Sequence, residues 1–163
     1  MASRVKDTGS MEDIVSELKK LNQMSVVVGV MGSEESEIQI IAGTHEFGAT
    51  INRINEKTGE TSIIEIPERS YIRATLDKKS VQDGIFKIVK LGVDGIVART
   101  LSAIQVANQV GLYVVGEIKN RIVSSDPEFA PLSESYSKRK KGPGILRESL
   151  KLFNAISYKV VQA

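Results

Sequence analysis

The stretch from Val93 to Ser124 constrains the fold most, because its apolar residues recur at the spacing of one long helix face. The steps of this stripe alternate between four and three residues, along Val97, Leu101, Ile104, Asn108, Gly111, Val115, Ile118 and Ile122. A second apolar stripe lies beside it and widens the face, so the helix is expected to be mostly buried. Small residues in its middle, Ala103, Ala107 and Gly111, leave room for a strand or another helix to approach closely. We therefore predict a spine helix over residues 93–124.

The length of 163 residues suits one domain with appendages, and we treat residues 1–163 as a single domain. Hydrophobic residues make up 41% of the chain and charged residues 26%, which is typical of a globular protein. No apolar run approaches the ~20 residues of a membrane span, and the first residues lack the apolar core of a signal peptide. We expect a soluble protein made inside the cell, without a membrane partner.

Local patterns predict the remaining elements. Before the spine we expect a helix over 11–23, a strand over 24–31, a helix over 37–47 and strands over 49–54 and 62–66. Residues 68–73 then lead into a helical pattern that runs through Leu76, and another helical pattern covers 81–91. After the spine we expect a flexible basic loop over 125–144 with one helical turn at 132–137, then a helix over 145–153 and a strand over 155–161. This order predicts an α+β fold, in which a small antiparallel or mixed sheet packs on one long helix.

Residues 49–66 read as an extended β-hairpin arm, because a charged, glycine-containing turn, Asn55–Glu60, separates the two strands. The arm is longer and more charged at its tip than a compact domain requires. A plain solvent-exposed hairpin is the other interpretation. We expect the arm to contact a neighbouring subunit or a connector protein through Arg53, Glu56, Lys57 and Glu60.

Two arginines flank an aromatic residue after the second strand, at Arg69, Tyr71 and Arg73. Arginine pairs with carboxylates through two parallel hydrogen bonds, and interfaces favour such polar-aromatic groups. We expect these residues to lie at an interface or to anchor a loop. A solvated start of a helix is the alternative.

The strongest local charge is the run Lys138, Arg139, Lys140 and Lys141, followed by glycines and a proline. We expect it to contact DNA or a partner protein, and to become ordered only on assembly; a solvated loop is the alternative. The overall net charge of +2 is too small to indicate nucleic-acid binding by itself.

No pattern in the chain indicates catalysis or a cofactor. His45 is the only histidine and there is no cysteine, so metal ligands of the usual kinds are scarce. No serine has the Gly-x-Ser-x-Gly setting, and Gly142-Pro143-Gly144 lacks the lysine and hydroxyl of a phosphate loop. We expect a protein that is not an enzyme.

Two motifs resemble a known family. The segment His45-Glu46-Phe47-Gly48, a variable hairpin and then Ile66-Pro67-Glu68-Arg69-Ser70-Tyr71-Ile72-Arg73 are similar to paired motifs of small tail-completion and neck proteins of tailed bacteriophages. Pro131-Leu132-Ser133, the lysine-rich loop, Ile145-Leu146 and Ile156-Ser157-Tyr158-Lys159-Val160 resemble that family's C-terminal part. The resemblance covers roughly residues 26–161. The chain departs from the family at Arg147-Glu148-Ser149, where an Asp-Thr-Gly turn is usual.

The resemblance implies a structural virion protein, in the tail or neck of the particle and in the host cytoplasm during assembly. It implies a homo-oligomeric ring, a hexamer rather than a dodecamer, at the head–tail joint. The partners would be the head connector and the tail tube or tail terminator proteins, and DNA would pass through the lumen without sequence specificity. The alternative, from another class, is a small DNA-binding or regulatory protein that acts through residues 138–141.

Overall fold

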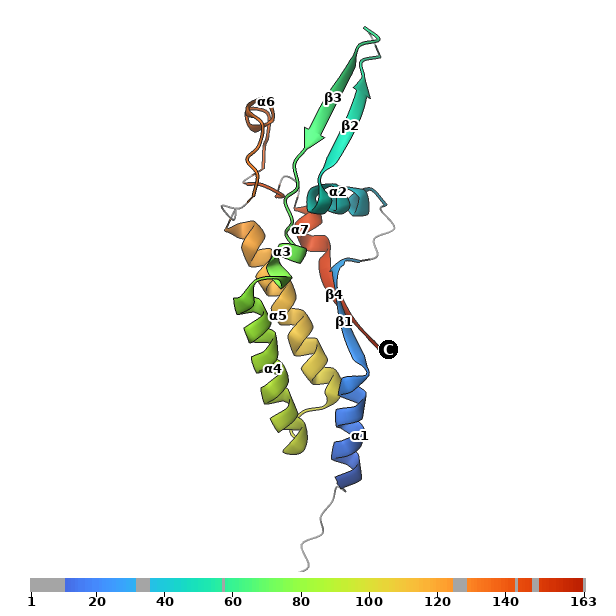
Figure 1. The fold of residues 1–163 in the computed structure, drawn as a ribbon, viewed down its shortest axis with the longest axis vertical. Helices are drawn as coiled ribbons and strands as arrows, with labels where there is room; N and C mark the ends of the chain where they lie inside the picture. Colours follow the sequence, from blue (N-terminus) through green and yellow to red (C-terminus); the bar gives the residue numbers. More distant parts are fainter. Residues whose placement is uncertain are drawn as a thin grey trace, which may run out of the picture.

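A pair of long helices and a two-stranded sheet form the body of the molecule, and a second two-stranded sheet projects from it (Figure 1). The computed structural model describes residues 11–31, 36–56, 58–124, 129–142, 144–147 and 150–162. In chain order the elements are α1 (Met11–Asn22), β1 (Met24–Val30), α2 (Ser36–Phe47), β2 (Ala49–Ile54), β3 (Thr61–Ile66), α3 (Arg73–Leu76), α4 (Lys79–Val97), α5 (Ala103–Val123), α6 (Glu134–Ser137), α7 (Lys151–Ala155) and β4 (Ile156–Gln162). The predicted α+β class is confirmed.

The predicted spine helix over residues 93–124 is wrong at its start, because two helices share that stretch. Residues 93–97 are the end of α4, and α5 begins at Ala103. Arg99 ends α4 with a left-handed φ of 60°, and the side chain of Gln105 accepts a hydrogen bond of 2.8 Å from the N–H of Ser102, which begins α5. The apolar stripe continues across the break since Leu101, in the loop, is itself half-buried.

Helix α4 also runs through Gly92, the residue between the predicted segments 81–91 and 93–124. A methyl group added at Gly92 would lie 2.5 Å from Cγ1 of Val106 on α5. This glycine therefore serves the close packing of α4 on α5, and it does not end a helix.

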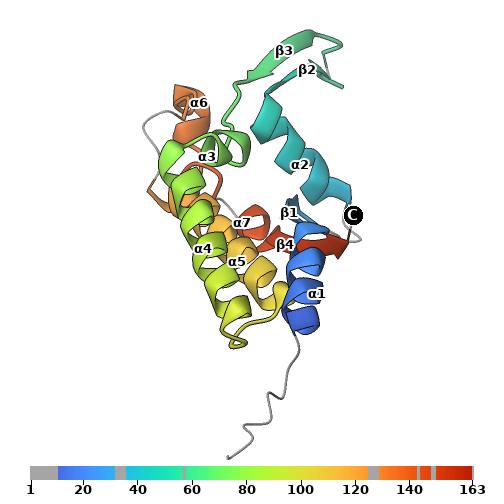
Figure 2. The ribbon, with the colours of Figure 1, turned by 60° about the horizontal axis from the view of Figure 1, so that its bottom comes forward.

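The sheet of the body pairs β1 with β4 in antiparallel register, with Val28 opposite Tyr158. Helix α5 packs on this sheet, and α1 lies beside the far ends of α4 and α5 (Figures 1 and 2). A methyl group added at Gly111 of α5 would lie 2.2 Å from Cδ2 of Tyr158. The expectation that small residues in the spine allow a strand to approach closely is confirmed.

The C-terminal helix predicted over 145–153 is also wrong in its extent. Helix α7 covers only Lys151–Ala155, because Leu146 (φ 63°) and Leu150 (φ 58°) adopt left-handed backbone conformations that interrupt a helix. Residues 148 and 149 lie outside the described residues. The strand expected at the C-terminal end is confirmed as β4.

The main core lies where α2, α5 and the C-terminal segment meet. Its buried members come from distant parts of the chain: Ala42, Tyr71, Val114, Ile118, Ile122, Phe129, Leu146, Leu152 and Ile156. Within the described residues, no helix is long and apolar enough to cross a membrane.

Candidate functional site

The hairpin β2–β3 is the predicted arm, and it is uncovered on both faces. Its strands pair in antiparallel register, and every described residue from Thr50 to Glu65 is exposed. Ile51 and Ile64 are opposite one another on one face, whereas Ile54 and Ile63, with 65% and 68% of their surface exposed, belong to the other face. The hairpin extends away from the body as a separate two-stranded sheet (Figure 1).

An isolated two-stranded hairpin is marginally stable in water, and its two outer edges offer unpaired N–H and C=O groups. Fully burying one isoleucine contributes about 1.5–3 kcal/mol. A partner surface that covers either face of this hairpin would therefore bury apolar side chains and stabilise the paired strands. Arg53, Glu56 and Glu60 all lie exposed on it, as a contact arm requires, while Lys57 lies outside the described residues.

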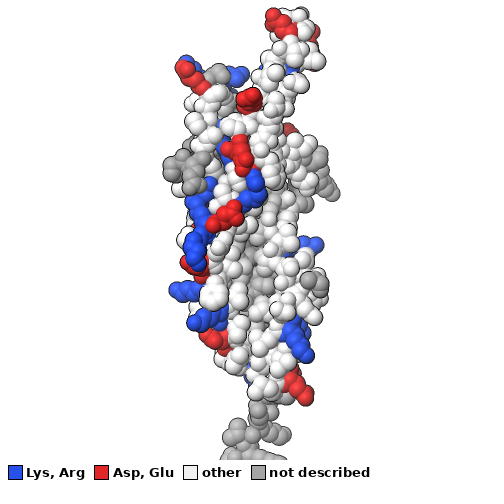
Figure 3. Space-filling model, viewed as in Figure 1, with Lys and Arg blue, Asp and Glu red and all other residues white. Residues whose placement is uncertain are grey.

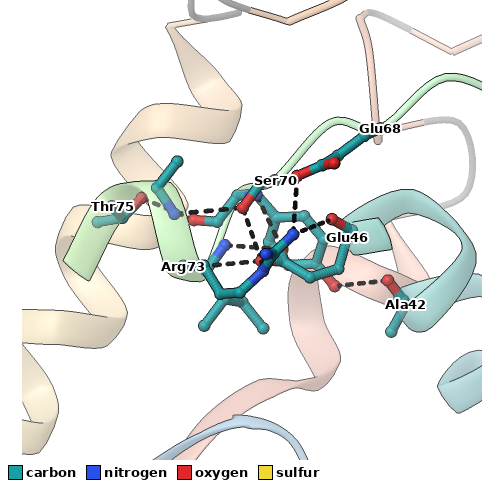
Figure 4. A network of polar contacts seen from close by, with 9 residues as sticks. Ala42, Glu46, Glu68, Ser70, Arg73 and Thr75 are labelled. Carbon is teal, nitrogen blue, oxygen red and sulfur yellow. Dashed lines mark hydrogen bonds and ion pairs between the residues drawn. The ribbon is translucent and has the colours of Figure 1, made fainter. Parts of the chain in front are cut away.

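Glu46, at the end of α2, ties the base of the hairpin to the segment that follows it (Figure 4). Only 4% of its surface is exposed. Its carboxylate accepts hydrogen bonds of 2.9 Å from the backbone N–H groups of Tyr71, Ile72 and Arg73, at the start of α3. A buried carboxylate thus satisfies backbone donors that would otherwise lack partners.

Side chains complete the network around Glu46. The hydroxyl of Ser70 donates to the Glu46 carboxylate at 2.7 Å, and Arg73 Nε donates to it at 3.3 Å. Arg73 Nη2 donates to the Glu46 carbonyl at 3.1 Å and pairs with Glu68 at 2.7 Å. Burial by itself raises the pKa of Glu46, but the hydrogen bonds from the backbone and Ser70 outweigh it and hold the pKa below its ordinary value.

The structure separates the three residues that were expected to act together after the second strand. Tyr71 is fully buried in the core, so it has no surface to present to another subunit. Arg69 is 5% exposed and donates from Nε to the carbonyl of Ala130 (2.8 Å) and from Nη2 to the carbonyl of Pro131 (3.0 Å). Of the two roles expected for Arg69, an interface contact or a loop anchor, these hydrogen bonds correspond to the loop anchor. Arg73 alone keeps exposed surface, beside the Phe47 ring at 4.7 Å.

The basic run does not form a uniform patch. Lys138 pairs with Glu134 one turn earlier on α6 at 2.7 Å, and Lys140 is half-buried with its ammonium 5.9 Å from the centre of the Tyr136 ring. Arg139 and Lys141 are exposed. Helix α6 and the hairpin stand at the same end of the molecule, on opposite flanks (Figures 1 and 2).

A cavity of about 470 Å³ lies between α2 and the segment that carries the basic run. Its lining is mainly aliphatic, with Ile38, Ile41, Leu132, Ile145, Leu146, Leu150 and Leu152. Among the described residues, its charged side chains are those of Glu37, Arg69, Lys140 and Lys151, and His45 and Tyr136 also line it. Sequence patterns did not reveal this cavity, because its walls come from positions more than 100 residues apart.

His45 lines this cavity, and its buried Nδ1 atom has no hydrogen-bond partner among the described residues. Burial lowers the pKa of His45, and the nearby charges of Arg69 and Lys140 lower it further. Both effects favour the neutral imidazole. Within the described residues, no group of three or more His, Asp or Glu side chains is arranged to hold a metal ion.

Compared with known proteins, the chain matches no protein-family model, no curated protein and no solved structure. Its function is therefore argued from the hairpin, the Glu46 network and the cavity.

Proposed function

We propose that this chain is a structural protein of a tailed-bacteriophage particle, which forms a ring at the head–tail joint as a tail-completion or neck protein. The observation that carries the proposal is the uncovered hairpin. The hairpin exposes isoleucines on both faces, and such apolar surface is typical of a contact with another protein. In a ring, the neighbouring subunit would cover it.

The Glu46 network gives the resembling motifs a physical reason to occur together. Glu46 belongs to the first motif, and the N–H groups that it binds belong to the second. The N–H of Arg69 also donates to the carbonyl of His45 at 2.8 Å. The two motifs therefore form one unit at the base of the hairpin, which supports treating them as a single signature.

In the proposed ring, a hexamer, each hairpin contacts the next subunit or the adjoining connector protein. The lumen passes DNA without reading its sequence, and the tail tube or terminator protein binds the opposite end. The exposed side chains of the basic run, Lys138, Arg139 and Lys141, face DNA or an acidic partner in this arrangement.

The test compares the full chain with a variant whose hairpin is shortened to Ile51-Asn-Gly-Ile64. Native mass spectrometry and negative-stain microscopy are expected to show rings of one stoichiometry for the parent and monomers for the variant. Circular dichroism and the melting temperature should stay close to the parent's, because every described residue that is removed is exposed. Rings formed by the shortened variant would contradict the arm role.

The genomic position of the gene provides a second, independent check. We expect neighbouring genes to encode head and tail proteins, and deletion of the gene to leave filled heads and separate tails in electron micrographs. A monomer that binds DNA with steep salt dependence would instead favour a DNA-binding or regulatory protein.

A further inference from the structure

Helix α1 is covered less completely than the other long helices. Unlike α2, α4 and α5, it has no buried residue. Its apolar side chains Ile14, Leu18 and Leu21 are only half-buried. Glu17 links it to α5, since its carboxylate accepts a hydrogen bond of 2.8 Å from the N–H of Ala103. A helix of twelve residues is marginally stable by itself in water, so a further surface that covers α1 would stabilise it.

One edge of α1 exposes apolar side chains to solvent. Met11 and Val15 expose 72% and 42% of their surface, and the half-buried Leu18 and then Asn22 continue the row. The steps of four, three and four residues are those of a seam between two paired helices. Shallow grooves of about 500 and 340 Å³ lie along α1, and Val15 and Lys19 line both of them. A ridge between two grooves can pack against the same surface of a second helix.

The charges of α1 are separated along its axis. Glu12 and Asp13 lie in the first turn, and Lys19 and Lys20 lie in the last. Figure 3 shows acidic side chains at the end of α1 away from the sheet and basic ones at its other end. Glu12 and Lys19 are exposed and two turns apart, so both border the seam on the same side. Asp13 and Lys20, the latter paired with Glu17 at 2.7 Å, lie on the opposite side of the helix from the seam.

We propose that two copies of this chain pair through α1 in antiparallel orientation, about a two-fold axis at the middle of the helix. Met11, Val15 and Leu18 of both copies form the apolar centre of the contact. Glu12 of each copy faces Lys19 of the other, so the same ion pair occurs twice. A parallel pair would bring each of these charges level with its like in the other copy, which favours the antiparallel orientation.

This contact goes beyond the proposed function, because it does not use the hairpin. Helix α1 lies at the end of the molecule away from the hairpin and runs along the long axis (Figure 1). An antiparallel pair therefore carries its two hairpins at opposite ends, and it would join rings of the proposed kind back to back. The contact is small, with three apolar side chains from each copy, so the pairing is weak and depends on concentration.

A cross-linking assay measures the pairing whether or not rings form. The chain has no cysteine, so Val15→Cys in the full chain introduces a single thiol in the seam. A short bis-maleimide should convert this variant into a dimer, whereas Lys90→Cys on the exposed side of α4 should remain a monomer. Circular dichroism verifies that both variants fold. A folded Val15→Cys variant that gives no more dimer than Lys90→Cys overturns the pairing.

Charge reversal in the Val15→Cys chain tests the orientation. Glu12→Lys alone and Lys19→Glu alone should each lower the dimer yield about tenfold, because both ion pairs become contacts between like charges. An equimolar mixture of these two variants should give mixed dimers, identified by mass, since opposite charges then meet at both positions. One chain that carries both reversals should regain the yield of the Val15→Cys chain.

The double reversal separates pairing from an effect on the helix itself. It opposes the helix dipole at both ends of α1, so α1 is least stable in that variant. A purely structural effect would make the double variant the poorest dimer, whereas the proposed contact restores it. The matched control, Lys90→Glu with Asp94→Lys on the exposed side of α4, should leave the yield unchanged. Single reversals that pair as before, or a mixture without mixed dimers, would contradict the contact.

The outcomes also separate this inference from the proposed function. Rings that form without cross-linking through α1 remove the α1 contact and leave the ring proposal standing. Dimers through α1 in a chain that forms no rings support the α1 contact and remove the ring.

Discussion

Replacing Glu46 with alanine is expected to lower the free energy of unfolding by about 3–5 kcal/mol, because buried and half-buried backbone N–H groups are then left without an acceptor. The N–H groups of Tyr71, Ile72 and Arg73 lose their acceptor, and the Ser70 hydroxyl loses its own. For a chain of this size the melting temperature should fall by roughly 10 °C. The matched control is Glu65→Ala on the exposed strand β3, which should change stability by less than about 0.5 kcal/mol.

Glu46→Gln separates the charge from the shape of the side chain. Because the folded protein holds the pKa of Glu46 below its ordinary value of 4.5, the carboxylate contributes stability that is present above that pH and is lost as the pH falls through the folded pKa. The parent should therefore lose stability below about pH 4.5 more steeply than Glu46→Gln does. Denaturant titrations at several pH values measure this difference. Equal slopes in parent and variant would show that the carboxylate is not the acceptor described.

Gly111→Ala is expected to destabilise the protein by about 1–3 kcal/mol, although alanine is the better helix former by about 1 kcal/mol. The added methyl group would lie 2.2–2.6 Å from the Tyr158 ring, near the part of the side chain that the backbone holds in place. Helix α5 would then have to move off the β1–β4 sheet. Chemical denaturation of the purified protein measures the loss.

The same helix provides a matched control for this substitution. A methyl group added at Gly116 meets no atom within 4 Å, so Gly116→Ala should stabilise the protein by up to about 1 kcal/mol. Combining Gly111→Ala with Tyr158→Val should cost less than the sum of the two single changes, because the smaller side chain removes the clash. Additive costs would mean that Tyr158 does not set the distance between α5 and the sheet.

Local signals predicted the elements that are bounded by turns. Gly48, with φ of 74°, directly follows the predicted and observed end of α2 at Phe47, and the charged turn between β2 and β3 indicated the hairpin. The break between α4 and α5 was not predicted. Apolar periodicity indicates which side of a helix is buried, and the pattern continues from one helix into the other without interruption. The spacing of Ser102 and Gln105, a start signal for a helix, was visible in the sequence and marks the break.

The candidate site was less accessible from the sequence. A hairpin brings its two ends together, so contacts between Glu46 and the segment after Ile66 follow from the predicted strands once the register is known. The burial of Arg69 and Tyr71 depends on the loop at Ala130 and on α5, which no local pattern positions. The cavity depends on long-range packing in the same way.

The anchored base of the hairpin has a mechanical consequence. One strand continues from α2 after a single glycine, and the other leads within a few residues to the backbone that Glu46 holds. Arg69 then links this root to the carbonyls of Ala130 and Pro131. A load on the tip is therefore transmitted through these hydrogen bonds into the body of the molecule and is not absorbed by a flexible hinge.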